Sequence, residues 1–118
     1  MKHSLQNFGM GIDIVDIERF KKLPFSKNKD FYKKIFSDSE IKYCLKFKYS
    51  SSHFGGKFAL KEAVKKSINH PLSMKNIKTS HSNSKPKISI TNCDDYLFLA
   101  TLSHESNLAV AVVISQKI

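Results

Sequence analysis

The stretch Phe54–Ile68 reads FGGKFALKEAVKKSI, and it decides the fold that we expect for the rest of the chain. At 100° per residue its small and apolar side chains gather on one arc of a helix, and its lysines and Glu62 gather on the other. Phe54 and Phe58 fall among the lysines. We therefore expect a central helix, capped from the polar break Ser50–Ser52, whose second face is covered by another element, a partner subunit or a ligand.

Upstream of this helix the sequence predicts one strand followed by short helices. Phe8–Val15 alternates isoleucines with carboxylates, which is typical of a strand that places Asp13 on the face opposite the isoleucines. Ile17–Leu23 is basic and helical in pattern. Ser37–Glu40 (SDSE) has the spacing of a capping box and predicts a helix that runs to about Phe47.

Downstream of the central helix the pattern changes to strands. The expected strands are Met74–Ser80, Lys87–Thr91, Leu97–Ser103 and Leu108–Ser115. The last two are joined by His104–Asn107 and read as an antiparallel hairpin, with the final strand apolar enough to be buried on both faces. One strand, several helices and then a run of strands predict an α+β fold, a small antiparallel sheet packed with helices. At 118 residues, we expect a single domain over 1–118.

Composition limits the kinds of partner that the protein can have. The formal net charge is +10, from 20 Lys+Arg against 10 Asp+Glu, and Arg19 is the only arginine. Such a surface favours an acidic partner, whether nucleic acid, anionic membrane, nucleotide phosphates or an acidic protein. A 41% share of hydrophobic residues argues against a disordered basic tail. Cys44 and Cys93 form no CxxC pair, and with no signal peptide in Met1–Phe8 and no membrane span we expect a reduced, cytoplasmic protein.

Three motifs, taken in order, resemble the holo-acyl-carrier-protein synthase family of small phosphopantetheinyl transferases. Gly11–Ile14 matches the family's strand motif G-(I/L/V)-D-(I/V/L). Phe54–Lys66 matches its central F-x-x-(R/K)-F-A-x-K-E-A-x-x-K. Ser103–Val113 carries its Ser-His step followed by A-x-A-x-V. Order, spacing and length fit over essentially the whole chain, so the resemblance implies the family's α+β fold.

The chain departs from the family pattern at three places. Lys57 stands where an arginine is usual, Ser84–Pro86 replaces a G-K-P turn, and Asn69–Leu72 replaces a glycine-rich stretch. These departures concern coenzyme contacts and a loop, and they leave Asp13 and Glu62 unchanged.

The resemblance implies transfer of the 4′-phosphopantetheine arm of coenzyme A to a serine of apo-acyl carrier protein. Adenosine 3′,5′-bisphosphate is released, and the reaction supports fatty acid biosynthesis. It also implies Mg²⁺ held by Asp13 and Glu62, which agrees with the preference of this cation for carboxylates, phosphate oxygens and water. Lys66, one turn beyond Glu62, is assigned to neutralising the transferred phosphate or the leaving group. Either Glu62 or a metal-bound water would remove the serine proton.

The remaining assignments concern the lysine-rich surface. The residues expected to contact coenzyme phosphates are Lys57, Lys61, Lys85 and His104. The residues expected to dock the acidic carrier protein are Arg19, Lys21 and Lys22. The family is typically a homotrimer with coenzyme bound between subunits, which offers one reason for the positions of Phe54 and Phe58.

Two other readings remain open on the sequence. The first is a small basic nucleic-acid-binding domain of the ribosome-associated kind, which the charge favours. The single arginine and the absence of an RNA-binding or helix-turn-helix motif argue against it, so we expect neither a nucleic acid nor a membrane partner. The second is a purely structural oligomeric domain. Carboxylates of Asp13 and Glu62 too far apart for one Mg²⁺ would favour these alternatives.

Overall fold

The computed structural model describes residues 5–118, so part of the opening Met1–Phe8 lies outside the described residues. All the α-helices described lie between the first strand and the remaining four strands in sequence. In chain order the elements are β1 (Phe8–Asp16), α1 (Glu18–Lys21), the 3-10 helix η1 (Phe25–Lys27), α2 (Lys29–Ile35), α3 (Asp38–Leu45), α4 (Ser50–Ser67), the 3-10 helix η2 (Met74–Asn76), β2 (Ile77–Ser82), β3 (Lys85–Ile90), β4 (Tyr96–Glu105) and β5 (Leu108–Lys117).

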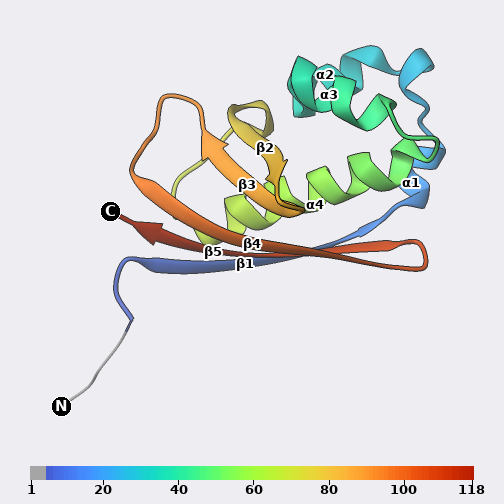
Figure 1. Cartoon of the computed structure of the whole chain (residues 1–118). Coiled ribbons are helices and arrows are strands. Elements are labelled where there is room, and N and C mark those ends of the chain that lie inside the picture. Colours follow the sequence, from blue (N-terminus) through green and yellow to red (C-terminus); the bar gives the residue numbers. More distant parts are fainter. Residues whose placement is uncertain (1–4) are drawn as a thin grey trace.

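The strands form two antiparallel sheets. The larger has the order β1-β5-β4, with Gly11 opposite Val113 and Glu105 opposite Leu108, and β2 and β3 form a separate hairpin. The last two strands form the predicted hairpin, whose turn includes Ser106 in the left-handed region. The α+β prediction is confirmed. Figure 1 shows α4 lying along one face of the larger sheet.

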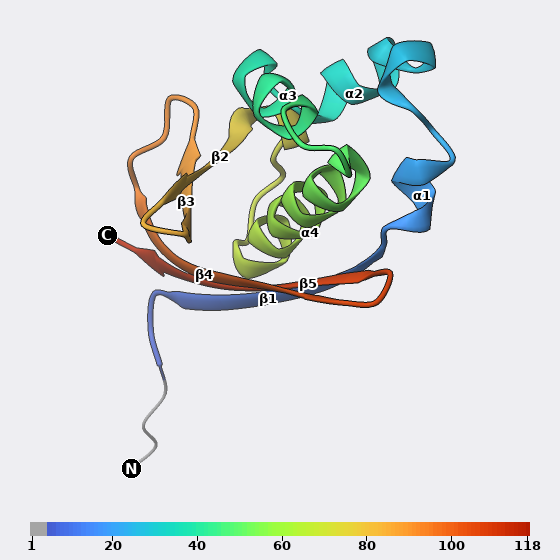
Figure 2. The same ribbon diagram turned by 45° about the vertical axis from the view of Figure 1, so that its right-hand side comes forward.

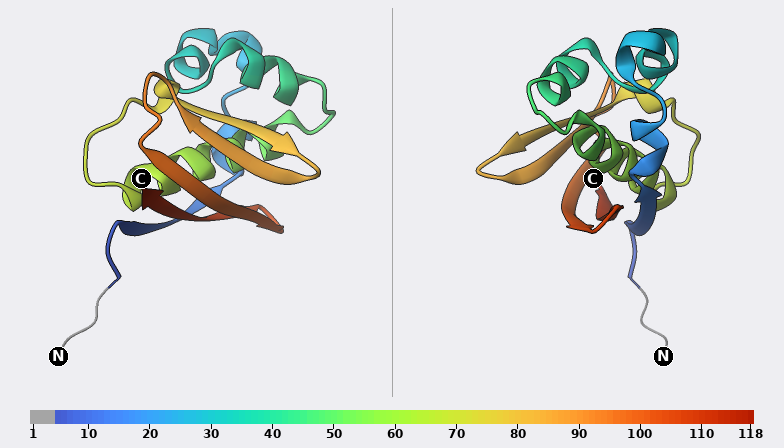
Figure 3. Two further views of the ribbon diagram at one scale, coloured as in Figure 1. Left: turned by 60° about the vertical axis from the view of Figure 1, so that its left-hand side comes forward. Right: turned by 90° about the vertical axis from the view of Figure 1, so that its right-hand side faces the viewer.

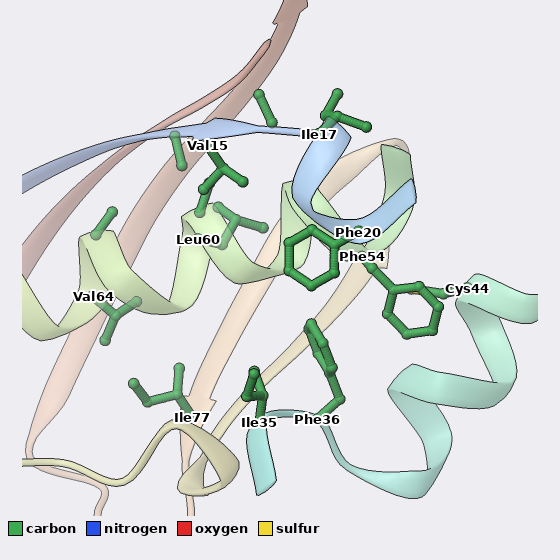
Figure 4. Packing of buried hydrophobic residues seen from close by; sticks show 14 of the residues in the cluster. Val15, Ile17, Phe20, Ile35, Phe36, Cys44, Phe54, Leu60, Val64 and Ile77 are labelled. Carbon is green, nitrogen blue, oxygen red and sulfur yellow. The ribbon is translucent and has the colours of Figure 1, made fainter. Parts of the chain in front are cut away.

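The central helix is covered on its second side by the helices that precede it. In Figure 2, α1, α2 and α3 lie around the side of α4 that faces away from the sheet. Phe54 is buried there, and its ring centroid lies 4.6 Å from that of Tyr32 and 5.1 Å from that of Phe36. Phe20 from α1 joins the same cluster, as Figure 4 shows. Another element of the same chain therefore explains Phe54, and no partner subunit is needed for it.

Several element boundaries differ from those expected. Ser50–Ser52 is not a cap, because α4 begins at Ser50 and its N-cap is Tyr49 without a side-chain hydrogen bond. Met74–Asn76 is a 3-10 helix rather than the start of a strand. The capping box is confirmed: Ser37 Oγ accepts from Glu40 N at 3.3 Å, and Glu40 Oε1 accepts from Ser37 N at 2.8 Å.

One face of the larger sheet is packed and the other is open within the described residues. Ala111 and Val113 of β5 face α4 and are fully buried. On the opposite face Met10 of β1 is 70% exposed and Leu99 of β4 is 71% exposed. Figure 3 shows no helix over this face. The expectation that β5 is buried on both faces is therefore wrong for the single chain. We call this surface the open sheet face; its strongly exposed members are Met10, Ile12, Ile14, Leu97 and Leu99.

Candidate active site

The strand β1 passes unusually close to α4 because two of its residues are glycines. A Cβ at Gly9 would lie 1.7 Å from Ser67 O, and one at Gly11 would lie 1.8 Å from Ala63 O. Two strand residues span about 6.6 Å and four helix residues about 6 Å, so β1 runs antiparallel to α4 in step with its turns. Asp13 is the next residue on the same face of β1, and it therefore lies beside the turn that ends at Glu62.

The close approach brings Asp13 into contact with Lys66. Lys66 Nζ donates to Asp13 Oδ1 at 3.1 Å and to Ile12 O at 3.0 Å. The Asp13 side chain is 16% exposed, whereas that of Lys66 is 53% exposed. Glu62 lies one turn before Lys66 and is half-buried. The structure thus joins Asp13 directly to Lys66 and places Glu62 on the adjoining turn of the same helix.

The donor set at this junction fits a hard divalent cation. Mg²⁺ is commonly held by one or two carboxylates, with phosphate oxygens and water filling the other positions. Asp13 and Glu62 supply carboxylate oxygens only. No group of three or more His, Cys, Asp or Glu side chains able to hold a metal occurs within residues 5–118.

Lys57 and Lys61, expected at coenzyme phosphates, point instead into the protein interior. Lys61 is fully buried and donates to Glu40 Oε1 at 2.6 Å, Ile35 O at 2.8 Å and Met74 O at 3.1 Å. These contacts use all three protons of the ammonium group. The expectation that Lys61 contacts phosphates is corrected, because no proton and no exposed surface remain. Lys57 is also buried and donates to Thr79 Oγ1 at 2.9 Å and Thr79 O at 3.3 Å.

The buried charges at this place stabilise one another through hydrogen bonds. Burial raises the pKa of the Glu40 carboxyl, but hydrogen bonds from Lys61 and Thr79 outweigh this effect, so the pKa lies below its usual value. Burial lowers the pKa of Lys61, and the Glu40 carboxylate opposes that shift. Burial also lowers the pKa of Lys57. The four side chains form a continuous polar group inside an otherwise apolar core.

A second group gathers around His104 at the end of β4. His104 Nε2 lies 3.3 Å from Ser52 O in the first turn of α4. His53 stacks on Phe47 with ring centroids 3.7 Å apart, and burial followed by the charges of His104, His81 and Lys57 lowers the pKa of His53. Sequence reasoning missed His53 and His81 because they belong to no motif. We call His53, His81 and His104 the histidine cluster.

The other expected phosphate and docking residues lie on the surface. Lys85 is exposed at the first position of β3. Arg19 and Lys21 belong to α1, which follows directly on β1, and Lys22 caps its C-terminus. The Arg19 guanidinium lies over the Phe58 ring at 5.1 Å, and the Phe20 ring packs against it at 5.7 Å, so α1 covers that phenylalanine. Lys21 also lines a surface hollow of about 610 Å³ between α1, η1 and the start of α4.

Comparison with known proteins identifies the family. Residues 9–113 match the 4′-phosphopantetheinyl transferase superfamily. The holo-[acyl-carrier-protein] synthase of Thermodesulfovibrio yellowstonii is 36% identical over 109 residues, covering 90% of this chain and 96% of the relative. That of Geotalea daltonii is 32% identical over 123 residues, covering 93% of this chain and 98% of the relative.

Solved structures agree with this assignment. The crystal structure of the Helicobacter pylori holo-[acyl-carrier-protein] synthase in complex with coenzyme A has a TM-score of 0.77 at 37% identity, covering 91% of this chain and 99% of that one. A holo-(acyl-carrier-protein) synthase from Bacillus anthracis in complex with CoA (3′,5′-ADP) has a TM-score of 0.79 at 26% identity, covering 93% and 96% of the two chains. With nearly complete coverage in both directions, the chain belongs to the 4′-phosphopantetheinyl transferase superfamily and, within it, to the holo-[acyl-carrier-protein] synthase family of transferases.

Proposed function

We propose that this enzyme transfers the 4′-phosphopantetheine arm of coenzyme A to a serine of apo-acyl carrier protein and releases adenosine 3′,5′-bisphosphate. The observation that carries the proposal is the junction of β1 and α4, where Asp13 contacts Lys66 and Glu62 lies on the next turn. The coenzyme complexes of the Helicobacter pylori and Bacillus anthracis relatives support coenzyme A as the donor.

The reaction requires that charge on a pyrophosphate be neutralised as its bond breaks. Asp13 and Glu62 would hold Mg²⁺, which supplies positive charge to the phosphate oxygens when it is bound. Lys66 directs two protons to Ile12 O and Asp13 Oδ1, which leaves one for a phosphate oxygen of the coenzyme. Its contact with Asp13 holds the ammonium in place before the coenzyme arrives, so little reorganisation is needed during transfer. In this proposal the serine oxygen attacks the phosphorus of the transferred arm, and the bisphosphate leaves on the opposite side.

The histidine cluster and α1 would bind the two reactants. His104, with His53 and His81 beside it, presents imidazole donors for coenzyme phosphates, and exposed Lys85 is a further candidate. The exposed cations of α1 and its C-cap would dock the acidic carrier protein close to Asp13, because α1 begins two residues after β1 ends. These cations are Arg19, Lys21 and Lys22.

The proposed assembly is a homotrimer formed through the open sheet face. Monomeric proteins rarely expose a contiguous apolar surface of this kind. The side chains of Met10, Ile12 and Leu99 on neighbouring strands would be removed from water if copies of the chain packed there.

The setting proposed for the reaction is the cytoplasm, in support of fatty acid biosynthesis, with the whole chain acting as a single domain. Cys44 and Cys93 are both free thiols, which supports a reducing compartment. No helix within residues 5–118 has the length and apolar character needed to cross a membrane.

The test is the initial rate of carrier-protein modification as a function of Mg²⁺ concentration. We expect Asp13→Asn and Glu62→Gln each to lower the rate by about 10²-fold or more. Each substitution removes a carboxylate from the proposed Mg²⁺ site, and with it part of the charge stabilisation of the transition state. Asp94→Asn, an exposed carboxylate far from β1 in sequence, is the matched control and should behave as wild type. Full Mg²⁺-dependent transfer by either site variant would exclude the assignment.

A further inference from the structure

A buried polar group ties α4 to the elements on its far side from the sheet. Glu40 Oε1 accepts from Lys61 Nζ at 2.6 Å and from Ser37 N at 2.8 Å. Glu40 Oε2 accepts from Thr79 N at 2.8 Å and from Thr79 Oγ1 at 2.6 Å. Thr79 Oγ1 in turn accepts from Lys57 Nζ at 2.9 Å. Glu40 therefore accepts four hydrogen bonds and joins α3, α4 and β2. We call the side chains of Glu40, Lys57, Lys61 and Thr79 the Glu40 network.

The network holds one face of α4, and the candidate site uses another. At 100° per residue, Lys57 and Lys61 lie about 40° apart on the helix circumference. Ala63, which contacts β1, lies about 160° from Lys61. Glu62 and Lys66 lie between these two faces, about 100° and 140° from Lys61. Rotation of α4 about its axis would therefore move the Glu62 carboxylate past Asp13.

The contact between α4 and β1 fixes that rotation only in part, because its side-chain hydrogen bonds come from Lys66, whose side chain is half exposed. Gly9 and Gly11 bring the strand close, but they contribute no side chains that interlock with the helix surface. Lys57 and Lys61, in contrast, are buried and hydrogen-bonded at fixed positions to atoms of α2, α3, η2 and β2. Directional bonds to several separate elements specify the rotation of a helix better than apolar packing on glycines.

We propose that Glu40 is a positioning residue for the active site: through Lys61, Thr79 and Lys57 it sets the rotation of α4, and so aims Glu62 at Asp13. This inference rests on the proposed function, because it gives Glu62 a role at the metal. Glu40 lies in the opposite layer from the sheet and touches no reacting group. It acts only through the helix that carries the site.

The test uses a variant that removes both charges of the buried pair. Glu40→Gln/Lys61→Met leaves neither partner as an unpaired buried charge, and the buried Lys57 keeps both of its hydrogen bonds to Thr79, so the protein should fold. We expect its dissociation constant for Mn²⁺, measured by electron paramagnetic resonance in the presence of coenzyme A, to rise about tenfold. We expect kcat for carrier modification to fall about tenfold as well, with a melting temperature within a few degrees of wild type.

A double-mutant cycle separates positioning from general damage. On a Glu62→Gln background the same pair of substitutions should cause no further loss of Mn²⁺ affinity or kcat, because the group being aimed is gone. Ser115→Ala, which removes a buried hydrogen bond from β5 to Ser67 O at the other end of α4, is the control. It should lower the melting temperature and leave Mn²⁺ affinity and kcat unchanged.

Defined outcomes overturn the inference. Wild-type Mn²⁺ affinity and kcat in Glu40→Gln/Lys61→Met would overturn it. So would a loss of Mn²⁺ affinity and kcat on the Glu62→Gln background as large as the loss on the wild-type background. If that variant does not fold, Thr79→Val decides: it keeps the backbone donor to Glu40, and the inference requires a smaller shift in the same direction. A wild-type protein that neither binds Mn²⁺ nor modifies the carrier would defeat the proposed function itself, which distinguishes the two failures.

Discussion

Substituting alanine for Gly11 tests the close contact on which the site depends. The added Cβ would lie 1.8 Å from Ala63 O and 2.8 Å from Ala63 C, both backbone atoms that cannot rotate away. Separations under 3.0 Å do not occur for real Cβ atoms, so β1 and α4 must move apart by at least 3.0 − 1.8 = 1.2 Å. That displacement acts on the two elements that carry Asp13 and Glu62.

The expected magnitude is large for one methyl group. Overpacking of a well-packed interior costs about 1–3 kcal/mol, and we expect the upper end here because backbone rather than side chain is displaced. At about 4 °C per kcal/mol for a chain of this size, the melting temperature should fall by about 12 °C. A misplacement of about 1 Å at a catalytic site costs about 10²-fold in rate. We therefore expect kcat for carrier modification to fall about 10²-fold at a temperature where the variant is folded.

The assays are thermal unfolding followed by circular dichroism and steady-state carrier modification. Gly55→Ala is the matched control, since its Cβ would meet Ile17 Cγ1 at 3.2 Å, a side-chain atom that can shift. It also gains helix propensity of about 1 kcal/mol, so its melting temperature should stay within a few degrees of wild type. A Gly11→Ala protein with the melting temperature and kcat of wild type would show that neither the packing of β1 on α4 nor the site depends on this close contact.

Three further outcomes are expected. Burial, with nearby positive charges, lowers the pKa of His53 and His81 from the usual 6.5, so the unfolded chain binds protons more readily. The melting temperature should thus fall between about pH 7 and pH 5, and His53→Gln/His81→Gln should flatten the decline; an equal slope in the variant would contradict this. Burial raises the pKa of the Cys44 thiol to about 12, so a disulfide reagent at pH 8 should modify Cys93 and spare Cys44 in the native protein, and equal rates would argue against the packing. Leu99→Lys should convert a trimer into a 13.5 kDa monomer in sedimentation, whereas a monomeric wild type would exclude the proposed assembly.

Local pattern was sufficient to predict much of the fold. Alternation in β1 correctly placed Asp13 opposite Ile12 and Ile14, because a strand has a strict period of two. The SDSE spacing correctly predicted the start of α3, because both halves of a capping box lie within one turn. Lys66 was placed near Asp13 through the resemblance, and the contact between them agrees with that placement.

Features that depend on contacts between distant segments could not be read from the sequence. Lys57 and Lys61 fall on the charged arc of the helix, and their burial is possible only because Glu40 and Thr79, distant in sequence, meet them there. The sequence pattern revealed only the capping role of Glu40 at the start of α3. In the structure its carboxylate oxygens also accept hydrogen bonds from Lys61 of α4 and Thr79 of β2. His53 lies near enough to His104 to feel its charge only because α4 packs on β4. No spacing within the sequence indicates this packing.

Transfer of the phosphopantetheine arm is tested most directly by the mass of apo-acyl carrier protein after incubation with the enzyme, coenzyme A and Mg²⁺. We expect the carrier to gain the mass of one phosphopantetheine on a single serine, together with stoichiometric adenosine 3′,5′-bisphosphate. We also expect Glu62→Gln to modify only a small fraction of the carrier in the time in which wild type reacts to completion, because its rate is about 10²-fold lower. An unchanged carrier mass with the wild-type enzyme, or complete modification by Glu62→Gln over the same time, would contradict these expectations.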